Sequence, residues 1–364
     1  MRSPPTPKSA IDGRSRRSSR ARSAACRSAE TSATLNMILA AGAPGAAGMR
    51  PTKYPGRWPE ARLFVFDERM SMDWQPPSAP GYRGPGVVVH PLAAVDDGAA
   101  LGDRVEVGPF ASVAGDVELG AGCRVMTHAT VLPGVRRGPC CEVHPGAVLG
   151  GEPQNRSYRP SRTFLEVGPR TVFREYVTVS RATRPGEATR IGADCLFMAG
   201  SHVGHDCVIG DRVALANCVQ LAGYCQAADA AVVGGATSVH QFVRIGRHAM
   251  IGGGSGLTQD APPFMLTAGI APAVVYGVNL VGLRRSGTPA AIVEDLKRAF
   301  RLLYRSGLNV SQALERIREE LAASPEVSEL VGFIAESKRG LCAGARQRRA
   351  QPSRNVRGGA GGGR

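Results

Sequence analysis

The sequence lacks a long apolar run. No hydrophobic stretch approaches the about 18 residues that a membrane-spanning helix needs, so we expect no transmembrane segment. A convincing secretory signal is absent as well. The nine cysteines are scattered apart from the adjacent Cys140 and Cys141, and they form no tight metal-binding pattern. We therefore expect reduced, packed thiols in a cytoplasmic protein.

Acidic residues are scarce at both ends of the chain. Residues 1–84 hold 14 Lys/Arg against 6 Asp/Glu, and residues 338–364 hold 8 Lys/Arg and no acid. Because the whole chain has a formal net charge of +15, the two ends account for its basic character and the middle is near neutral. A nucleic-acid-binding protein needs a basic stripe on its folded part. We therefore expect no nucleic-acid partner.

Large apolar side chains are rare at the start of the chain. Residues 1–36 are rich in Arg, Ser and Ala, and such a segment cannot bury enough surface to order itself. We expect residues 1–84 to form a disordered basic extension, either an organellar transit peptide or the product of a start codon assigned too far upstream. The Gly/Arg-rich residues 341–364 are expected to be a disordered tail.

The middle of the chain contains a six-residue repeat. Aliphatic residues recur at every sixth position, and Gly or another small residue often follows them. In the first block, ten of eleven repeat positions are Val or Leu, and Arg137 is the exception. The positions of the two long blocks are Val89, Val95, Leu101, Val107, Val113, Leu119, Val125, Val131, Arg137, Val143 and Leu149, then Ile191, Phe197, Val203, Ile209, Leu215, Leu221, Ala227, Val233, Val239, Ile245, Ile251 and Leu257.

A period of six matches neither an α-helix nor one long alternating strand. It is typical of a hexapeptide β-helix, in which three hexads close one triangular coil of about eighteen residues. We predict an all-β left-handed parallel β-helix over residues 85–265. Residues 266–340 are expected to form a C-terminal α-helical domain, because apolar stripes at helical spacing follow Thr288-Pro289 and Ser324-Pro325.

Two gaps interrupt the repeat, one from Gly151 to Glu166 and one from about Arg184 to Thr189. Insertions in a solenoid become loops on one face, which is often the binding face. The first insertion carries Gln154 and three arginines. Those arginines either keep the loop soluble or contact an acidic partner or a phosphate.

Reactive side chains stand inside the second block, in the stretch Ser201-His202-Val203-Gly204-His205-Asp206-Cys207. At eighteen residues per coil, Gly223 and Gln241 should lie in one line with His205. The residues expected beside that line are His202, Asp206, Tyr224 and His240. One strip of the prism therefore gathers histidines, a carboxylate, a glycine and a side-chain amide.

These groups suit acyl transfer to a hydroxyl. His205 supplies a general base that works near neutral pH, and Asp206 could orient it. The Gly223 N–H could stabilise a developing oxyanion, and glycine there would let a substrate approach closely. A zinc site like that of gamma-type carbonic anhydrases, built on the same prism, is the alternative. His205 and His240 lie about two coils apart, but His248 is awkwardly spaced for a third ligand, so we expect no metal.

The chain resembles the bacterial acyl-[acyl-carrier-protein]–UDP-N-acetylglucosamine O-acyltransferases, which begin lipid A biosynthesis. The resemblance covers about residues 87–340 and is specific because it rests on blocks as well as on hexads. The blocks are Val89-His90-Pro91, Ile191-Gly192, His202-Val203-Gly204-His205-Asp206-Cys207, Leu215-Ala216-Asn217, Leu221-Ala222-Gly223, Val239-His240-Gln241-Phe242, Gln259-Asp260-Ala261-Pro262-Pro263, Gly277-Val278-Asn279, Tyr304-Arg305-Ser306-Gly307 and Ser337-Lys338-Arg339-Gly340-Leu341.

The resemblance implies a homotrimer with its active sites between neighbouring prisms. It implies that His205 removes a proton from the glucosamine 3-hydroxyl, that Asp206 supports it and that the Gly223 amide holds the oxyanion. The donor would be a 3-hydroxyacyl chain on acyl carrier protein, and no cofactor is implied. The substrate-binding positions would be His202, His240, Gln241, Gln154, Tyr224, Asn279 and Arg285, the last of these at the nucleotide phosphates. Gly253 matches the position that limits acyl length.

The sequence departs from the family pattern around the substrate. Tyr224 stands where the family usually has histidine, and Ser157 where it has lysine. Ser180 replaces the histidine of a His-Arg-Gly motif, and Ser286 replaces an arginine after Arg285. Retained acyl transfer on UDP-N-acetylglucosamine is the expected function. Transfer to another sugar nucleotide, including N-acylation of an amino sugar, and an inactive β-helix scaffold are the alternatives.

Overall fold

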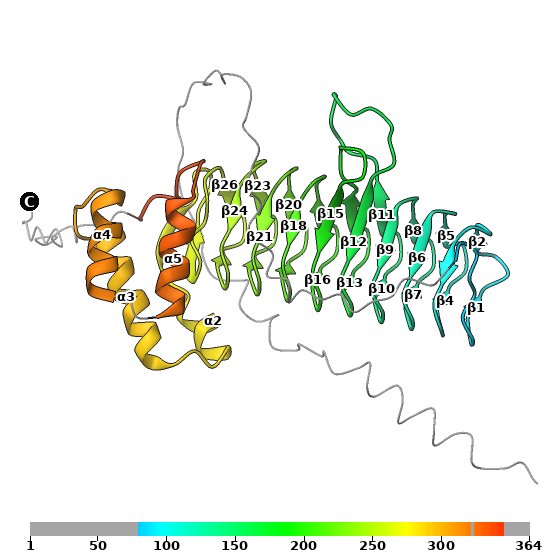
Figure 1. Ribbon diagram of the computed structural model, residues 1–364, viewed down its shortest axis with the longest axis horizontal. Coiled ribbons are helices and arrows are strands. Elements are labelled where there is room, and N and C mark those ends of the chain that lie inside the picture. The colour runs from blue at the N-terminus through cyan, green and yellow to red at the C-terminus, as the bar shows by residue number, and fades with distance from the viewer. Residues whose placement is uncertain (1–78, 322–323, 346–364) are drawn as a thin grey trace, which may run out of the picture. The chain divides into compact units, whose positions relative to one another are not determined.

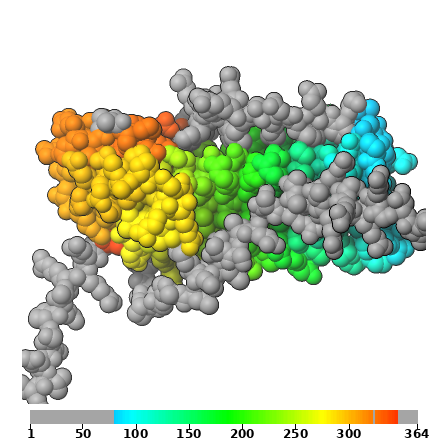
Figure 2. Space-filling model, turned by 90° about the horizontal axis from the view of Figure 1, so that it is seen from below, coloured from blue at the N-terminus to red at the C-terminus, as the bar shows by residue number. Residues whose placement is uncertain are grey.

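The computed structural model describes residues 79–321 and 324–345, so the predicted disordered segments lie largely outside the described residues. Within the described part, the chain winds into a left-handed parallel β-helix that is followed by helices (Figure 1), as predicted. In Figure 2 the colours form successive bands from cyan through green to yellow, because each coil stacks on the one before it.

Three sheets make the three sides of the prism. The first holds β1 (Val88–Val89), β4 (Glu106–Val107), β7 (Arg124–Val125), β10 (Glu142–Val143), β13 (Val172–Phe173), β16 (Leu196–Phe197), β19 (Ala214–Leu215), β22 (Val232–Val233), β25 (Met250–Ile251), β27 (Met265–Ala268) and β28 (Val274–Val278). The second holds β2 (Ala94–Val95), β5 (Ser112–Val113), β8 (Thr130–Val131), β11 (Val148–Gly151), β14 (Thr178–Ser180), β17 (His202–Val203), β20 (Gln220–Leu221), β23 (Ser238–Val239) and β26 (Gly256–Leu257). The third holds β3 (Ala100–Leu101), β6 (Val117–Leu119), β9 (Val135–Arg137), β12 (Phe164–Val167), β15 (Ala188–Ile191), β18 (Val208–Ile209), β21 (Gln226–Ala227) and β24 (Arg244–Ile245).

The strand register confirms the predicted coil length. His202 pairs with Gln220, and Gln220 pairs with Ser238, each eighteen residues further along. The two predicted insertions occupy residues 152–163, between β11 and β12, and residues 181–187, between β14 and β15. Both leave the prism as loops and the strands resume their pairing after them.

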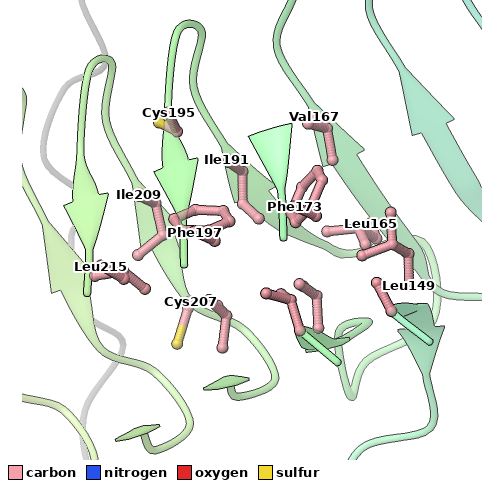
Figure 3. Close-up of a cluster of buried hydrophobic side chains, with 14 of the residues drawn as sticks. Leu149, Leu165, Val167, Phe173, Ile191, Cys195, Phe197, Cys207, Ile209 and Leu215 are labelled. Atoms are coloured by element: carbon pink, nitrogen blue, oxygen red, sulfur yellow. The ribbon is translucent and has the colours of Figure 1, made fainter. Parts of the chain in front are cut away.

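Aliphatic and aromatic side chains fill the inside of the prism (Figure 3). Leu149, Leu165 and Phe173 are among the side chains with no exposed surface. Arg137, the exception in the repeat, also points inward and is 0 % exposed. Its guanidinium carbon lies 5.3 Å from the centre of the Phe173 ring, and among the described residues its three side-chain nitrogens have no oxygen or nitrogen acceptor. Burying a guanidinium without a partner is costly, because the group keeps its charge.

The helical part has a core of its own. The three predicted helices are confirmed as α3 (Ala290–Tyr304), α4 (Val310–Leu321) and α5 (Pro325–Ala335). The short α2 (Leu280–Arg285) and the antiparallel pair β27–β28 had no counterpart in the prediction. The strand β27 begins at Met265 and pairs with β25, so the first sheet of the prism continues past residue 265. The predicted domain boundary after residue 265 stays a prediction. Every helix among residues 79–321 and 324–345 is too short or too polar to span a membrane.

Candidate active site

His205 and Asp206 form a corner of the prism, between β17 and β18. Asp206 has a φ of 59°, in the left-handed region, which turns the chain sharply into the next strand. Tyr224 and Phe242 repeat this conformation one and two coils further on, with φ of 62° and 67°. The corners therefore stack, and residues eighteen apart come together as predicted.

The His205 imidazole is bonded to its neighbour's carboxylate. Its Nδ1 lies 2.7 Å from Asp206 Oδ2, and the residue is only 9 % exposed. Burial raises the pKa of Asp206, but hydrogen bonds from His205 and Thr183 outweigh this, so the net pKa lies below its ordinary value. An ionised carboxylate can only accept, so Nδ1 carries the proton and Nε2 keeps its lone pair. This is the tautomer that a general base requires.

Gly223 lies directly against the His205 ring. A side-chain carbon at Gly223 would stand 2.5 Å from His205 Cε1 and 2.6 Å from Nε2, closer than atoms can approach. Glycine is therefore needed here to make room for the base, whereas the sequence suggested that it makes room for a substrate. The Gly223 N–H donates no hydrogen bond to any residue of the described chain, so it is available to an oxyanion.

A cavity of about 410 Å³ opens beside this corner. It collects five of the predicted site residues: His205, Gly223, His202, Gln154 and Gln241. The remaining lining residues are Ser180, Gly204, Gln220, Leu221, Ala222, Ser238 and Val239. Asp206 does not line the cavity and meets the base from behind, which fits an orienting carboxylate. The first insertion reaches the cavity through Gln154, and the expectation that the loops mark the binding face stays a prediction.

His202 also faces the cavity, but its chemistry differs from that of His205. Its Nδ1 lies 2.8 Å from Thr178 Oγ1. Burial, together with the neighbouring His205, lowers the pKa of His202. The side chain is therefore neutral at physiological pH, and none of the described carboxylates is bonded to it to stabilise a cation. These contacts favour substrate contact over proton transfer.

Thr183 is the residue that sequence reasoning missed. It belongs to the second insertion, and its N–H and Oγ1–H reach Asp206 Oδ1 and Oδ2 at 3.1 and 2.9 Å. Its Oγ1 also lies 3.0 Å from the Tyr224 hydroxyl. The only signal in the sequence was the insertion itself, because a loop outside the repeat has no periodicity from which to place a side chain.

The remaining predicted residues do not line this cavity. His240 bonds through Nδ1 to the Gln241 carbonyl at 3.2 Å. Asn279 caps α2 by accepting the Gly282 N–H, and it donates to the His248 carbonyl. Arg285 is exposed at the end of α2, and Gly253 is exposed one coil beyond Gly235. Their predicted roles toward substrate stay predictions.

The metal-binding alternative requires three convergent ligands. Across residues 79–321 and 324–345, no three His, Cys, Asp or Glu side chains come together in a way that could hold an ion. His205 is bonded to Asp206, and His240 to a backbone carbonyl. The expectation of no metal stays a prediction.

A hexapeptide prism with a carboxylate-supported histidine in a corner cavity defines the class of hexapeptide-repeat acyltransferases. Residues 188–223 match the family described as bacterial transferase hexapeptide (six repeats), and residues 260–342 match the family of UDP-N-acetylglucosamine O-acyltransferase, domain 2. The chain belongs to the acyl-[acyl-carrier-protein]–UDP-N-acetylglucosamine O-acyltransferase family.

Individual relatives support this assignment. The enzyme of that name from Verminephrobacter eiseniae is 48 % identical over 258 residues, which cover 70 % of this chain and 98 % of the relative. The one from Paraburkholderia phymatum is 46 % identical with the same coverage. Among solved structures, the UDP-N-acetylglucosamine acyltransferase from Campylobacter jejuni is 36 % identical with a TM-score of 0.67, covering 71 % of this chain and all of that chain.

Proposed function

We propose that this protein transfers a 3-hydroxyacyl chain from acyl carrier protein to the glucosamine 3-hydroxyl of UDP-N-acetylglucosamine, the first step of lipid A biosynthesis. One observation supports this more than any other. His205 has its Nδ1 bonded to Asp206 at 2.7 Å, and it lines the same cavity as the free N–H of Gly223. The relatives, named for this reaction, support the choice of donor and acceptor.

The chemistry follows from the tautomer of the base. Nε2 of His205 takes the proton of the sugar 3-hydroxyl as its oxygen attacks the thioester carbonyl. The Gly223 N–H stabilises the oxyanion of the tetrahedral intermediate. Collapse of the intermediate breaks the carbon–sulfur bond, and the proton on Nε2 passes to the departing thiolate. Throughout, Asp206 stabilises the imidazolium and keeps its orientation.

The substrate lies among side chains from three coils and one insertion. His202, Gln154 and Gln241 contact the acceptor from the cavity wall, and His240 acts from beside it. Asn279 and Arg285 meet the nucleotide, and Gly253 leaves room for the acyl chain. Because these last three do not line the cavity of the single chain, we infer a homotrimer with its sites between prisms. A cytoplasmic location fits a soluble carrier-protein donor.

A reaction with purified components tests the function. The chain is incubated with 3-hydroxyacyl carrier protein and UDP-N-acetylglucosamine, and the acylated nucleotide is detected by mass spectrometry. His205→Ala should lower kcat by at least about 100-fold, because general-base catalysis contributes that much or more. His128→Ala is the matched control, since His128 stands at a prism corner with a φ of 56° but does not line the cavity.

Two outcomes would contradict the proposal. Product formation at the wild-type rate by His205→Ala would show that His205 is not the general base. Turnover of an amino-sugar nucleotide, with none of UDP-N-acetylglucosamine, would replace the acceptor and favour N-acylation instead.

A further inference from the structure

The Asp206 carboxylate is held by more than the base. Oδ1 accepts the N–H of Thr183, and Oδ2 accepts both the Thr183 hydroxyl and His205 Nδ1. The Asp206 N–H donates to Thr189 Oγ1 at 2.9 Å. Both carboxylate oxygens and the backbone of Asp206 are thus fixed by residues that, apart from the base itself, do not line the cavity.

Tyr224 adds a further hydrogen bond to this network. Counting the available protons shows which group donates in each bond. A threonine hydroxyl has one proton to donate, and Thr183 uses it on Asp206 Oδ2. The Tyr224 hydroxyl, 3.0 Å from Thr183 Oγ1, must therefore be the donor in that bond. Burial raises the pKa of Tyr224, so the phenol keeps its proton at neutral pH. The bonds run from Tyr224 to Thr183 to Asp206, which also accepts from His205.

Tyr224 and Thr183 are held in place by their neighbours. The Tyr224 ring meets the His205 ring edge-on at 5.2 Å and stacks on Phe242 at 4.8 Å. Thr183 follows Ala182, which has no exposed surface and donates its N–H to the Phe164 carbonyl at 3.2 Å. The insertion is thereby anchored on the prism wall next to Asp206. A rigid support of this kind is what a precisely oriented base needs.

We propose that Thr183 and Tyr224 are positioning residues that hold Asp206, and through it His205, in the orientation and tautomer of the base. This inference rests on the proposed acyl transfer and assigns a role to the second insertion. It also changes the role of Tyr224: the resemblance implied a contact with substrate, whereas its hydroxyl is bonded behind the base. Neither residue touches the reacting atoms.

Kinetics of four variants test the proposal. Thr183→Val keeps the shape and the backbone N–H but loses the hydroxyl, and Tyr224→Phe loses only the phenol oxygen. Each should lower kcat about 10-fold and leave KM for UDP-N-acetylglucosamine nearly unchanged, because a lost hydrogen bond to a charged group acts on the base and not on substrate binding. Thr183→Ser should restore kcat. Thr267→Val is the matched control, since Thr267 is fully buried and its hydroxyl has no hydrogen-bond partner in the part of the chain that the structure describes.

A double-mutant cycle tests the direction of the chain. If the Tyr224 hydroxyl acts through Thr183 Oγ1, to which it is bonded at 3.0 Å, Tyr224→Phe should have no further effect in a Thr183→Val background. If the two substitutions lower kcat independently, so that their effects multiply in the double variant, the proposed order of hydrogen bonds is wrong. Wild-type kcat in Thr183→Val, or a Thr183→Ser variant as slow as Thr183→Val, would also overturn the proposal.

A measurement without substrate separates this inference from the proposed function. Diethyl pyrocarbonate modifies neutral imidazole, and peptide mass spectrometry follows the modification of His205 against pH, with His240 as the internal reference. In Thr183→Val, the carboxylate loses a donor and acts more strongly on His205, so the rise in reactivity moves to higher pH. An unchanged profile overturns the positioning role. A shifted profile in a chain that acylates no sugar nucleotide would sink the proposed function and leave the positioning role standing.

Discussion

Arg137 shows how a single residue can oppose the repeat that contains it. Its guanidinium is 0 % exposed and has no oxygen or nitrogen acceptor within the described residues, while the adjacent positions of its stack, Leu119 and Val167, are apolar. Charge from Arg137 reaches Cys141: burial would raise the pKa of that thiol, but a hydrogen bond from Cys123 and the arginine bring it to about 6. Arg137 therefore favours the ionised form of the Cys141 thiol.

Replacing this residue should stabilise the protein. We expect Arg137→Leu to raise the free energy of unfolding by about 1–4 kcal/mol, because an apolar side chain avoids the cost of burying the charge. Thermal or urea unfolding measures it, with Arg124→Leu, at an exposed arginine of the first sheet, as the control. A destabilised Arg137→Leu would mean that the guanidinium is well compensated in the folded chain.

Much of the site could be predicted from individual residues. His205 and Asp206 stood out as reactive groups in an inert repeat, and the eighteen-residue spacing alone was enough to place Gly223 beside them. The spacing could not show that Gly223 is needed by the His205 ring, because that depends on the side-chain rotamer. It could not place Thr183 either, since the path of an insertion is decided by tertiary contacts.

At the scale of elements, the helices followed from local signals and the hairpin did not. Apolar stripes and the Ser324-Pro325 start predicted α3, α4 and α5, and Ser324 does cap α5 by accepting the Val327 N–H. The six residues of α2 are too few for a helical stripe to be recognised. The hairpin β27–β28 begins after the hexads end at Leu257, where no period remains to be read.

Two arginines of the prism, Arg244 and Arg247, contact the last helix and its C-terminal end. Arg247, between β24 and β25, donates through Nε to Glu329 of α5 at 2.8 Å and lies 4.8 Å from the centre of the Phe264 ring. We expect Arg247→Met to increase amide hydrogen exchange in α5 by about 10-fold, because a partly buried charged bond is lost. Exchange in the prism strands should not change. Arg298→Met, within the helices, is the control, and unchanged exchange in α5 would show that the Arg247–Glu329 bond does not hold it.

The stability of the whole molecule should depend on pH through buried histidines. Burial lowers the pKa of both His202 and His248, so below about pH 6.5 these two groups bind more protons in the unfolded chain than in the folded one. Stability from these groups is present above that pH and is lost as the pH falls. Asp206, whose pKa is lowered, loses its contribution only below about pH 3.9, outside this window.

Melting temperatures at pH 7.5 and 5.5 measure this dependence. Asp260 opposes it, because burial raises its pKa, so the comparison is between wild type and His202→Gln. We expect the drop in melting temperature between the two pH values to be smaller in the variant. An equal drop in both proteins would exclude His202 as a source of the acid sensitivity.

The packing of His205 on Gly223 has a consequence for how such chains diverge. The His205 ring and Gly223, which has no side chain, lie on adjacent coils. A substitution at one of these positions therefore constrains the residue at the other. A histidine followed eighteen positions later by glycine, within an unbroken hexad register, is therefore a sequence signature of a chain that can still seat its base. A homologue that keeps the histidine but has any side chain at the second position retains the histidine motif, yet that side chain would clash with the imidazole ring of the base.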